Sequence, residues 1–294
     1  MRYTTITTAR PATTPNTLVI TLARPAVKNA FNQAMYADMT AALDDAAHSD
    51  EVAVVVITGA GSFFSSGADL KEMAEMAGPP LGSDDSDDDD GDDNKLARSA
   101  ATPRTRGWHA PVGRFMSRII TFPKILIAAV NGPAVGVGAT LLLHCDVVVA
   151  AESASMWLPF ARIAVVPEFC SSLLLPKILG PSLAGEMLYA QAKLTAPAAA
   201  RANWVSTLVP EPADVLPAAL ECAQRMTAPP LASDSLALFK AMVRDADRPT
   251  LLALCERELD LLDMRIDNGD VARAAMAFMM GRGSASALPP LSKL

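Results

Sequence analysis

Residues 125–140 read ILIAAVNGPAVGVGAT, an apolar run followed by a turn of glycine and other small residues. This order predicts a buried strand, a tight turn and a helix that opens with small side chains. Gly136 and Gly138 lack a Cβ, so the backbone of the turn can approach a ligand closely and its N–H groups can point outward. The turn that begins at Asn131 is therefore a candidate binding element.

The stretch after this turn carries a carboxylate in apolar surroundings. Residues 147–150 read VVVA and predict a second buried strand, and residues 165–172 read VVPEFCSS before a helix-like segment. A desolvated carboxylate tends to have a raised pKa and can take and return a proton near neutral pH. Glu168 is therefore a candidate acid–base residue. The alternative is that Glu168 caps the following helix, because acidic side chains favour a helix N-terminus.

A second loop of small residues lies earlier in the chain. Residues 52–58 form a continuous apolar run, which predicts a strand covered on both faces, and residues 59–71 read GAGSFFSSGADLK before the next helix. The backbone amides of such a loop are available to an anion or a polarised carbonyl, although most such loops only turn the chain. Two loops at the ends of neighbouring strands can present two N–H donors to one oxygen, which is what an oxyanion hole requires.

The order of elements predicts an α/β fold. Residues 17–22 alternate and are β-branched, residues 32–47 show helical spacing, and the strand at 52–58 follows. Residues 108–122 return to helical spacing, and Pro123 ends that helix.

The chain is largely helical beyond Glu168. Thr195 is a candidate N-cap with Pro197 in the first turn, and residues 205–209 predict a last strand or an extended link. Four amphipathic helices follow, at residues 214–226, 233–246, 250–268 and 270–280. They carry no evident chemistry, and their apolar stripes predict core or subunit interface and hence an oligomer.

Composition and charge restrict the class of function. The chain of 294 residues is 51% hydrophobic and 19% charged, which is typical of a globular protein. Its formal net charge of −7, with no basic stripe, argues against a nucleic-acid partner, and no apolar run is long enough to span a membrane. Much of the acid lies in residues 78–107, where a dense aspartate run cannot pack; it predicts a solvated insertion and not a calcium site.

The cysteines and histidines show no ligand spacing. Scattered cysteines without a CxxC pair predict reduced thiols in an intracellular protein, and isolated histidines are expected to be structural or exposed. We therefore expect no metal site. The residues concerned are Cys145, Cys170, Cys222, Cys255, His48, His109 and His144.

The last three residues are Ser292, Lys293 and Leu294. This tripeptide at an extreme C-terminus is a peroxisomal address that an import receptor reads. The preceding residues 288–290 (LPP) would keep the tail extended and accessible. We therefore expect the protein in the peroxisome or in a related organelle such as the glycosome.

The two glycine-containing loops together resemble those of the enoyl-CoA hydratase/isomerase (crotonase) superfamily. The resemblance rests on residues 66–71 (SGADLK) paired with residues 131–136 (NGPAVG), and it covers residues 18–282 with the acidic insertion as an interruption. Residues 167–172 (PEFCSS), followed by residues 176–178 (PKI), are most similar to the peroxisomal Δ3,Δ2-enoyl-CoA isomerases.

The resemblance implies a fold and an assembly. Residues 1–209 would form a ClpP-like spiral core of repeated ββα units, with the insertion at 78–107, and residues 210–294 would form a helical oligomerisation region. The implied assembly is a homotrimer or a hexamer. The implied substrate is an acyl-CoA thioester, and no separate cofactor is implied.

The resemblance also implies the residues of the site. The thioester carbonyl would accept hydrogen bonds from the backbone N–H groups of Ala68 and Val137, which stabilise the enolate formed when a proton α to the thioester is removed. Glu168 would be the base. The residues implied to contact the substrate or its CoA moiety are Ser66, Gly67, Ala68, Asp69, Leu70, Gly136 and Phe160.

Two positions depart from the hydratase pattern. Hydratases use two glutamates to position and activate water, and the matching positions here are Thr140 and Phe160, neither of which can act as an acid or a base. Glu168 remains, at the position where the monofunctional isomerases have their base. One carboxylate is sufficient for a shift of the double bond, because it can take a proton from C2 of a 3-enoyl-CoA and return it at C4.

The expected function is therefore the isomerisation of 3-enoyl-CoA to trans-2-enoyl-CoA in the β-oxidation of unsaturated fatty acids. Two alternatives remain open. One is another crotonase chemistry, of the hydratase, thioesterase or dehalogenase type. The other is a non-catalytic acyl-CoA-binding protein that has kept the fold. An intact Glu168 together with both N–H loops argues against the second alternative.

Overall fold

The computed structural model describes residues 3–77, 106–228 and 232–279 of the chain. The predicted acidic insertion at 78–107 therefore lies outside the described residues, except for its last two positions. The C-terminal tripeptide Ser292-Lys293-Leu294 lies outside them as well.

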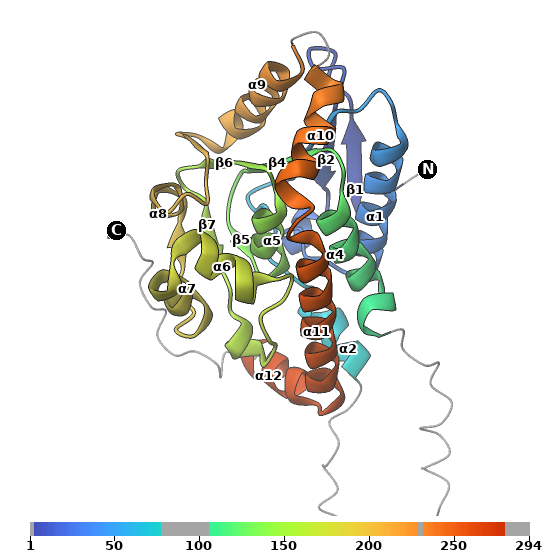
Figure 1. Ribbon diagram of the computed structural model, residues 1–294. Coiled ribbons are helices and arrows are strands. Elements are labelled where there is room, and N and C mark those ends of the chain that lie inside the picture. Colours follow the sequence, from blue (N-terminus) through green and yellow to red (C-terminus); the bar gives the residue numbers. More distant parts are fainter. Residues whose placement is uncertain (1–2, 78–105, 229–231, 280–294) are drawn as a thin grey trace, which may run out of the picture.

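Six strands form the larger of two sheets, in the order β1-β2-β3-β4-β6-β9 (Figure 1). β1 runs antiparallel to β2, and all the remaining neighbouring pairs of this sheet are parallel. The strands predicted from apolar runs are confirmed; β1, in the threonine-rich N-terminal segment, was not predicted. The strands are β1 (Ile6–Ala9), β2 (Thr17–Leu22), β3 (Val54–Gly59), β4 (Ile125–Val130), β6 (Val147–Ala151) and β9 (Thr207–Val209).

The central strands are buried on both faces, as their continuous apolar sequences predict. In β4, Ile125 and Ile127 face one apolar cluster with helix α9 (Val215–Thr227), whereas Leu126 and Ala128 face the other. The second cluster includes helices α1 (Gln33–His48) and α4 (Pro111–Thr121), which also pack against each other. Helix α9, which the sequence analysis assigned to the helical region, thus covers one face of the sheet.

Helix α1 shows how the sequence specifies its own boundaries. The Asn32 side chain accepts a hydrogen bond from the Met35 N–H at 2.9 Å, which satisfies a donor that the first helical turn leaves unpaired. Met35, Met39 and Leu43, spaced four residues apart, are fully buried against the sheet. Both the helix and its buried face confirm the prediction.

A second, smaller sheet contains three short strands, β5 (Ala134–Val135), β7 (Ser155–Trp157) and β8 (Leu194–Thr195). Strands of two or three residues are too short for an alternating pattern, so the sequence analysis did not predict them. β5 lies inside the turn that begins at Asn131. The smaller sheet therefore fixes the position of that turn by pairing it with β7.

Five short helices lie between strands in the described part of the chain. They are α2 (Leu70–Ala77), α5 (Val137–Thr140), α6 (Ser171–Leu179), α7 (Pro181–Leu188) and α8 (Ala196–Arg201). Two of them, α5 and α8, connect the smaller sheet to the larger one. The predicted cap of α8 is confirmed, because the Thr195 hydroxyl accepts the Ala198 N–H at 3.3 Å. Short 3-10 turns occur at Pro25–Val27, Gly107–His109, Leu141–His144, Phe160–Ile163 and Pro212–Asp214.

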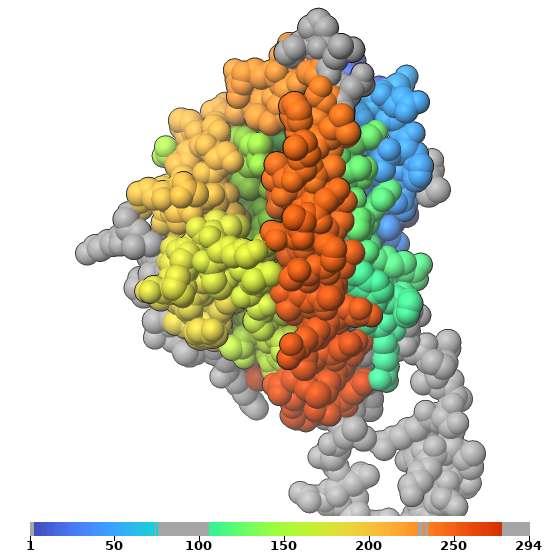
Figure 2. All heavy atoms as spheres, in the orientation of Figure 1, coloured from blue at the N-terminus to red at the C-terminus, as the bar shows by residue number. Residues whose placement is uncertain are grey.

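The last three helices run across the molecule in one band, coloured orange to red in Figure 2. They are α10 (Ala232–Arg244), α11 (Arg248–Asp267) and α12 (Asp270–Met279). α11 packs against α4. α12 packs against α2, the helix that follows the loop at residues 59–71. The C-terminal region therefore contacts the core beside that loop.

Helix α10 has one anchored face and one exposed face. Lys240 is buried and forms an ion pair with Asp146 at 2.8 Å, which ties the helix to the start of β6. The exposed face carries large apolar side chains, Leu238, Phe239, Met242 and Val243. Such a face is consistent with the predicted oligomer, which stays a prediction. Within the described ranges, no helix combines the length and apolarity that a membrane span requires.

Candidate active site

Two amide side chains, one buried and one half-buried, shape the loop that follows β3. Asn29 is fully buried and donates hydrogen bonds to the carbonyl oxygens of Ala60 and Phe63, both at 2.9 Å. Asn131, at the end of β4, accepts the Gly59 N–H at 3.1 Å. Because these contacts tie the loop to its neighbour in the sheet, its path is fixed by long-range hydrogen bonds and not by its own small side chains.

The two predicted loops contact each other directly. The Val135 N–H donates to the Ser65 carbonyl at 2.9 Å. Gly67 has a φ of +90°, and a Cβ at this position would lie 2.9 Å from the Val135 carbonyl oxygen. Gly136 has a φ of +51° and lies against Gly67. A side chain at Gly67 would therefore push the loops apart, which explains the glycine.

The residues after these two glycines line a common cavity. Ala68 follows Gly67, and Val137 follows Gly136 as the first residue of α5, where a helix provides no acceptor for the N–H group. Neither amide has an acceptor among the described residues. The structure thus brings together the two amides that the sequence analysis paired.

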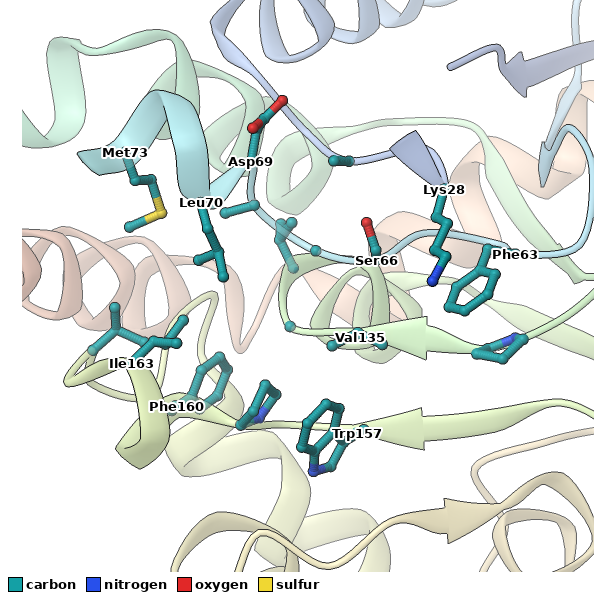
Figure 3. Close-up of a pocket in the computed structure, with 18 of the residues that line it drawn as sticks. Lys28, Phe63, Ser66, Asp69, Leu70, Met73, Val135, Trp157, Phe160 and Ile163 are labelled. Atoms are coloured by element: carbon teal, nitrogen blue, oxygen red, sulfur yellow. The ribbon is translucent and has the colours of Figure 1, made fainter. Parts of the chain in front are cut away.

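The cavity has a volume of about 560 Å³. Figure 3 shows Leu70 and Met73 on one side and Phe160, Ile163 and Trp157 on the other. The walls are mainly apolar, with a few polar groups, which is typical of a site for a small organic ligand. Every residue implied to contact substrate lines the cavity, together with both amides and the candidate base: Ser66, Gly67, Ala68, Asp69, Leu70, Gly136, Val137, Phe160 and Glu168.

Asp69 lines the cavity, but its carboxylate is engaged elsewhere. It forms an ion pair with Arg24 at 3.1 Å, and in Figure 3 it points away from the other labelled side chains. The Asp69 N–H donates to the Phe31 carbonyl at 2.9 Å. Asp69 therefore orders the loop and offers no acid–base group to a ligand.

Glu168 has the properties of an acid–base group. Its side chain is 9% exposed and lines the cavity, and no described residue donates a hydrogen bond to its carboxylate. Burial, assisted by the charge of Glu258, raises the pKa of Glu168 from its ordinary value to about 8. A carboxyl group with this pKa can both remove and return a proton near neutral pH.

The alternative role of Glu168, as a cap for the following helix, is wrong. Helix α6 begins at Ser171, Cys170 is its N-cap residue, and no acidic residue lies in its first turn. Glu258 of α11 accepts the Cys170 N–H at 2.7 Å and the Ser172 hydroxyl at 2.6 Å. The Glu168 side chain lines the cavity instead.

The two positions that depart from the hydratase pattern have different surroundings. Phe160 is 3% exposed and contributes an aromatic ring to the wall of the cavity. Thr140 is fully buried, and its hydroxyl lies 3.4 Å from the Val137 carbonyl oxygen. Neither position supplies a second acid–base group.

A smaller cavity of about 70 Å³ lies on the other side of Glu168. Ala68 and Glu168 line both cavities, so one N–H donor and the candidate base stand at their junction. The smaller cavity is lined largely by apolar and aromatic side chains of α1, α4 and α11, including Tyr36, Val112 and Leu259. A ligand held at the junction can extend an apolar chain into it.

Three basic side chains line the larger cavity, and the sequence analysis missed them. Lys28 lies over the Phe63 ring, 4.9 Å from its centroid, and Lys193 lies over the Trp157 ring at 4.8 Å. Lys71 is the third. Their positive charges suit a ligand that carries phosphate groups.

Helix α11 of the C-terminal region reaches the site, which the sequence analysis did not predict. α11 contributes Leu262 to the wall of the cavity and Glu258 to the surroundings of Glu168. The signal was present in the sequence, since Leu251, Cys255, Glu258 and Leu259 follow a helical spacing and are all buried. A charged residue on an otherwise apolar stripe indicates a specific partner in the interior.

Comparison with known proteins identifies the family. A sequence profile described as enoyl-CoA hydratase/isomerase matches residues 13–90 and 91–283. The chain belongs to this family. The two matched stretches meet inside the predicted acidic insertion. The resemblance noted from the two loops is thereby confirmed, as is the fold that it implied.

Proteins named as isomerases and a protein named as a hydratase are similar to this chain over most of its length. Enoyl-CoA delta isomerase 3, peroxisomal, of Mus musculus is 32% identical over 90% of this chain and 76% of its own length. Enoyl-CoA delta isomerase 2 of Rattus norvegicus is 34% identical over 88% of this chain, which spans 60% of that protein. The 2,3-dehydroadipyl-CoA hydratase of Escherichia coli is 34% identical over 90% of this chain and 92% of its own length.

Solved structures agree with the described fold. OdaA of Pseudomonas aeruginosa superposes with a TM-score of 0.79 at 33% identity, covering 94% of this chain and 98% of its own. An enoyl-CoA hydratase/isomerase of Pseudoalteromonas atlantica gives 0.77 at 28% identity, covering 94% and 97%. The chain is therefore an enzyme of the enoyl-CoA hydratase/isomerase family with the crotonase fold.

The raised pKa of Glu168 predicts a pH-dependent effect on stability. Because the folded-state pKa lies above the unfolded one, the folded protein binds more protons between these values, and stability falls as pH rises through this window. Glu168→Gln removes this penalty. One pKa unit corresponds to about 1.4 kcal/mol. The free energy of unfolding of the variant minus that of wild type should therefore be at least ~1 kcal/mol larger at pH 9 than at pH 5. Urea unfolding at both values measures this difference, and an equal effect at both would contradict it.

Proposed function

We propose that the enzyme shifts the double bond of 3-enoyl-CoA to give trans-2-enoyl-CoA, with Glu168 as the single acid–base residue. One observation carries the proposal. Two acidic residues line the larger cavity within the described part of the chain, and the Asp69 carboxylate is paired with Arg24. Glu168 is thus the one carboxylate available there for proton transfer.

The reaction needs one group that takes a proton and returns it. The Glu168 carboxylate removes a proton from C2 of the 3-enoyl-CoA, and the electrons of that C–H bond delocalise through the C3–C4 double bond and the thioester carbonyl. The resulting dienolate takes the same proton at C4, which leaves the double bond between C2 and C3. A pKa near 8 suits both steps, because the group is a strong enough base and still a competent acid.

The N–H groups of Ala68 and Val137 stabilise the dienolate. Both open toward the cavity from loops held in place by the contact between Ser65 and Val135. Donors fixed before the reaction lower the energy of the charge that develops on the thioester oxygen, and they need no reorganisation. Ala68 also stands at the junction of the two cavities, where the thioester would lie.

The wall of the cavity disfavours the addition of water. Hydration of a 2-enoyl-CoA requires a water molecule held by acidic groups, and the apolar ring of Phe160 takes the place of one of them. Exclusion of water also strengthens the hydrogen bonds to the oxyanion. The CoA moiety would enter past Lys28 and Lys193, and its acyl chain would extend into the smaller cavity.

The site of action in the cell is also a proposal. The mouse relative carries the word peroxisomal in its name, and the sequence ends in Ser292-Lys293-Leu294. A peroxisomal enzyme of unsaturated fatty-acid β-oxidation fits both. The import receptor and the trimer or hexamer stay predictions.

The proposed activity has a direct test. Purified enzyme should convert cis- or trans-3-enoyl-CoA to the conjugated 2-enoyl product, and Glu168→Gln should lower kcat by at least about 10³-fold because it removes the only proton carrier. kcat/KM should rise with pH through a midpoint near 8, since the free enzyme must lose the Glu168 proton first.

The E. coli relative makes hydration the competing activity, so the same enzyme is tested with 2-enoyl-CoA and water. We expect hydration to be at least about 100-fold slower than isomerisation, because no second acid is present to activate water. Faster hydration than isomerisation, or full isomerase activity in Glu168→Gln, would reject the proposal.

The oxyanion donors have a test of their own. Val137→Pro removes one N–H group at the first position of α5, where proline fits a helix. We expect kcat to fall by about 10²-fold or more with a small change in KM. The matched control is Val137→Ala, which also loses side-chain volume but keeps the N–H group; it should retain most of the wild-type kcat. Equal losses in both variants would show that packing, and not the N–H group, matters at this position.

A further inference from the structure

We propose that Glu258 of helix α11 is a positioning residue for Glu168. It holds the turn after Glu168 in a left-handed conformation and places a fixed negative charge beside the base. The inference rests on the proposed function of Glu168 and adds a residue that is 90 positions away in the sequence.

The turn that carries Glu168 into α6 is strained. Phe169 and Cys170 both have left-handed backbones, with φ values of 55° and 61°. Residues with a Cβ seldom adopt this conformation, and two in succession persist only where the surroundings impose it. The direction of the Glu168 side chain depends on this turn, because Glu168 immediately precedes it.

Helix α11 imposes the turn from one side. Glu258 is 5% exposed, and its two carboxylate oxygens accept different donors, the Cys170 N–H at 2.7 Å and the Ser172 hydroxyl at 2.6 Å. The Cys170 thiol donates to the Leu251 carbonyl of the same helix at 3.1 Å. Burial raises the pKa of Glu258 above its ordinary value, and the hydrogen bonds from Ser172 and Cys170 oppose this shift because they favour the ionised carboxylate.

A histidine imposes the turn from the other side. His144 is buried, its ring stacks on Phe169 with centroids 4.1 Å apart, and its Nε2 lies 2.9 Å from the Phe169 carbonyl oxygen. The carbonyl can only accept, so Nε2 carries the hydrogen. Burial lowers the pKa of His144 to about 4, so the ring is neutral at physiological pH and adds no charge to the site. The turn is therefore held between His144 and Glu258.

The two buried glutamates have opposite surroundings. Glu258 receives hydrogen bonds that favour its charged form, whereas the Glu168 carboxylate receives none from the described residues. When the surroundings of two carboxyl groups differ in this way, one keeps the charge and the other exchanges the proton. Burial and the Glu258 charge together raise the pKa of Glu168 to about 8.

Other titratable groups near Glu168 do not replace this charge. Burial raises the pKa of the Tyr36 hydroxyl on α1 well above its ordinary value. The pKa of the Cys255 thiol on α11 is also raised, first by its hydrogen bond with Cys170 and then by burial. Both groups are neutral at pH 7. Glu72 on α2 lines the smaller cavity with Glu168, and its carboxylate accepts the Gln33 N–H at 2.9 Å.

The test uses Glu258→Gln, which keeps an acceptor for the Cys170 N–H but removes the charge. We expect the rise of kcat/KM with pH to move toward lower pH by about one unit, because a neighbouring like charge is lost. kcat should fall by about 10-fold because the turn is held less firmly, while KM stays within about 3-fold. An unchanged pH profile and kcat in an otherwise active enzyme would overturn the inference.

A matched control separates positioning from general stability. Asp38 accepts four hydrogen bonds from the backbone and hydroxyl groups of Thr4 and Thr5, and it lines neither cavity. Asp38→Asn should lower stability without moving the pH profile. If it moves the profile as far as Glu258→Gln does, the inference is wrong.

Two further measurements keep the inference testable whatever the variant or the activity does. If Glu258→Gln fails to fold, Ser172→Ala removes one of the two donors, and kcat should fall at least about 3-fold with KM unchanged; wild-type kinetics would overturn the inference.

If wild type shows no isomerisation, the proposed function fails, but ¹³C-carboxyl NMR can still titrate Glu168, with its signal assigned by its loss in Glu168→Gln. The midpoint should drop in Glu258→Gln, and an unchanged midpoint would refute the coupling.

Discussion

The site depends on the backbone contact between the loop after β3 and the turn after β4. The hydrogen bond from the Val135 N–H to the Ser65 carbonyl sets the spacing of the two loops, and Gly67 permits it because no Cβ opposes the Val135 oxygen. β3 and β4 are parallel neighbours, so both loops leave the same edge of the sheet. This contact brings Ala68 and Val137 to one cavity, where the proposed mechanism uses their amides as the donors that stabilise an enolate.

In the proposed function, a single carboxylate in a mainly apolar cavity determines which reaction the common fold performs. Fold alone does not specify the chemistry, since relatives of this chain include isomerases and a hydratase by name. The proposal assigns the difference to the positions of Thr140 and Phe160, which carry no acid, and to Glu168, whose burial raises its pKa to about 8. Helix α11 brings the C-terminal region into this arrangement, because Glu258 accepts hydrogen bonds from the turn that follows Glu168.

The sequence predicted the features that depend on local pattern. The apolar runs of β3 and β4 and the loops after them were found because each strand is buried on both faces, and Glu168 was found because the family places its base there. The short strands β5, β7 and β8 were missed because two or three residues carry no period. The place of Glu258 on the apolar stripe of α11 signalled a partner in the interior, but the partners themselves, Cys170 and Ser172, are 88 and 86 residues away, and no local pattern encodes a hydrogen bond of that span.

The most direct test of the account is to follow the transferred proton itself. The enzyme would be given 3-enoyl-CoA that carries deuterium at C2, in ordinary water, and the position of the label in the 2-enoyl product would be read by mass spectrometry and NMR. If the Glu168 carboxyl takes the proton and returns it within a closed cavity, a substantial part of the label will appear at C4. A product whose C4 carries only solvent hydrogen, at every extent of reaction, would contradict transfer by one shielded carboxylate.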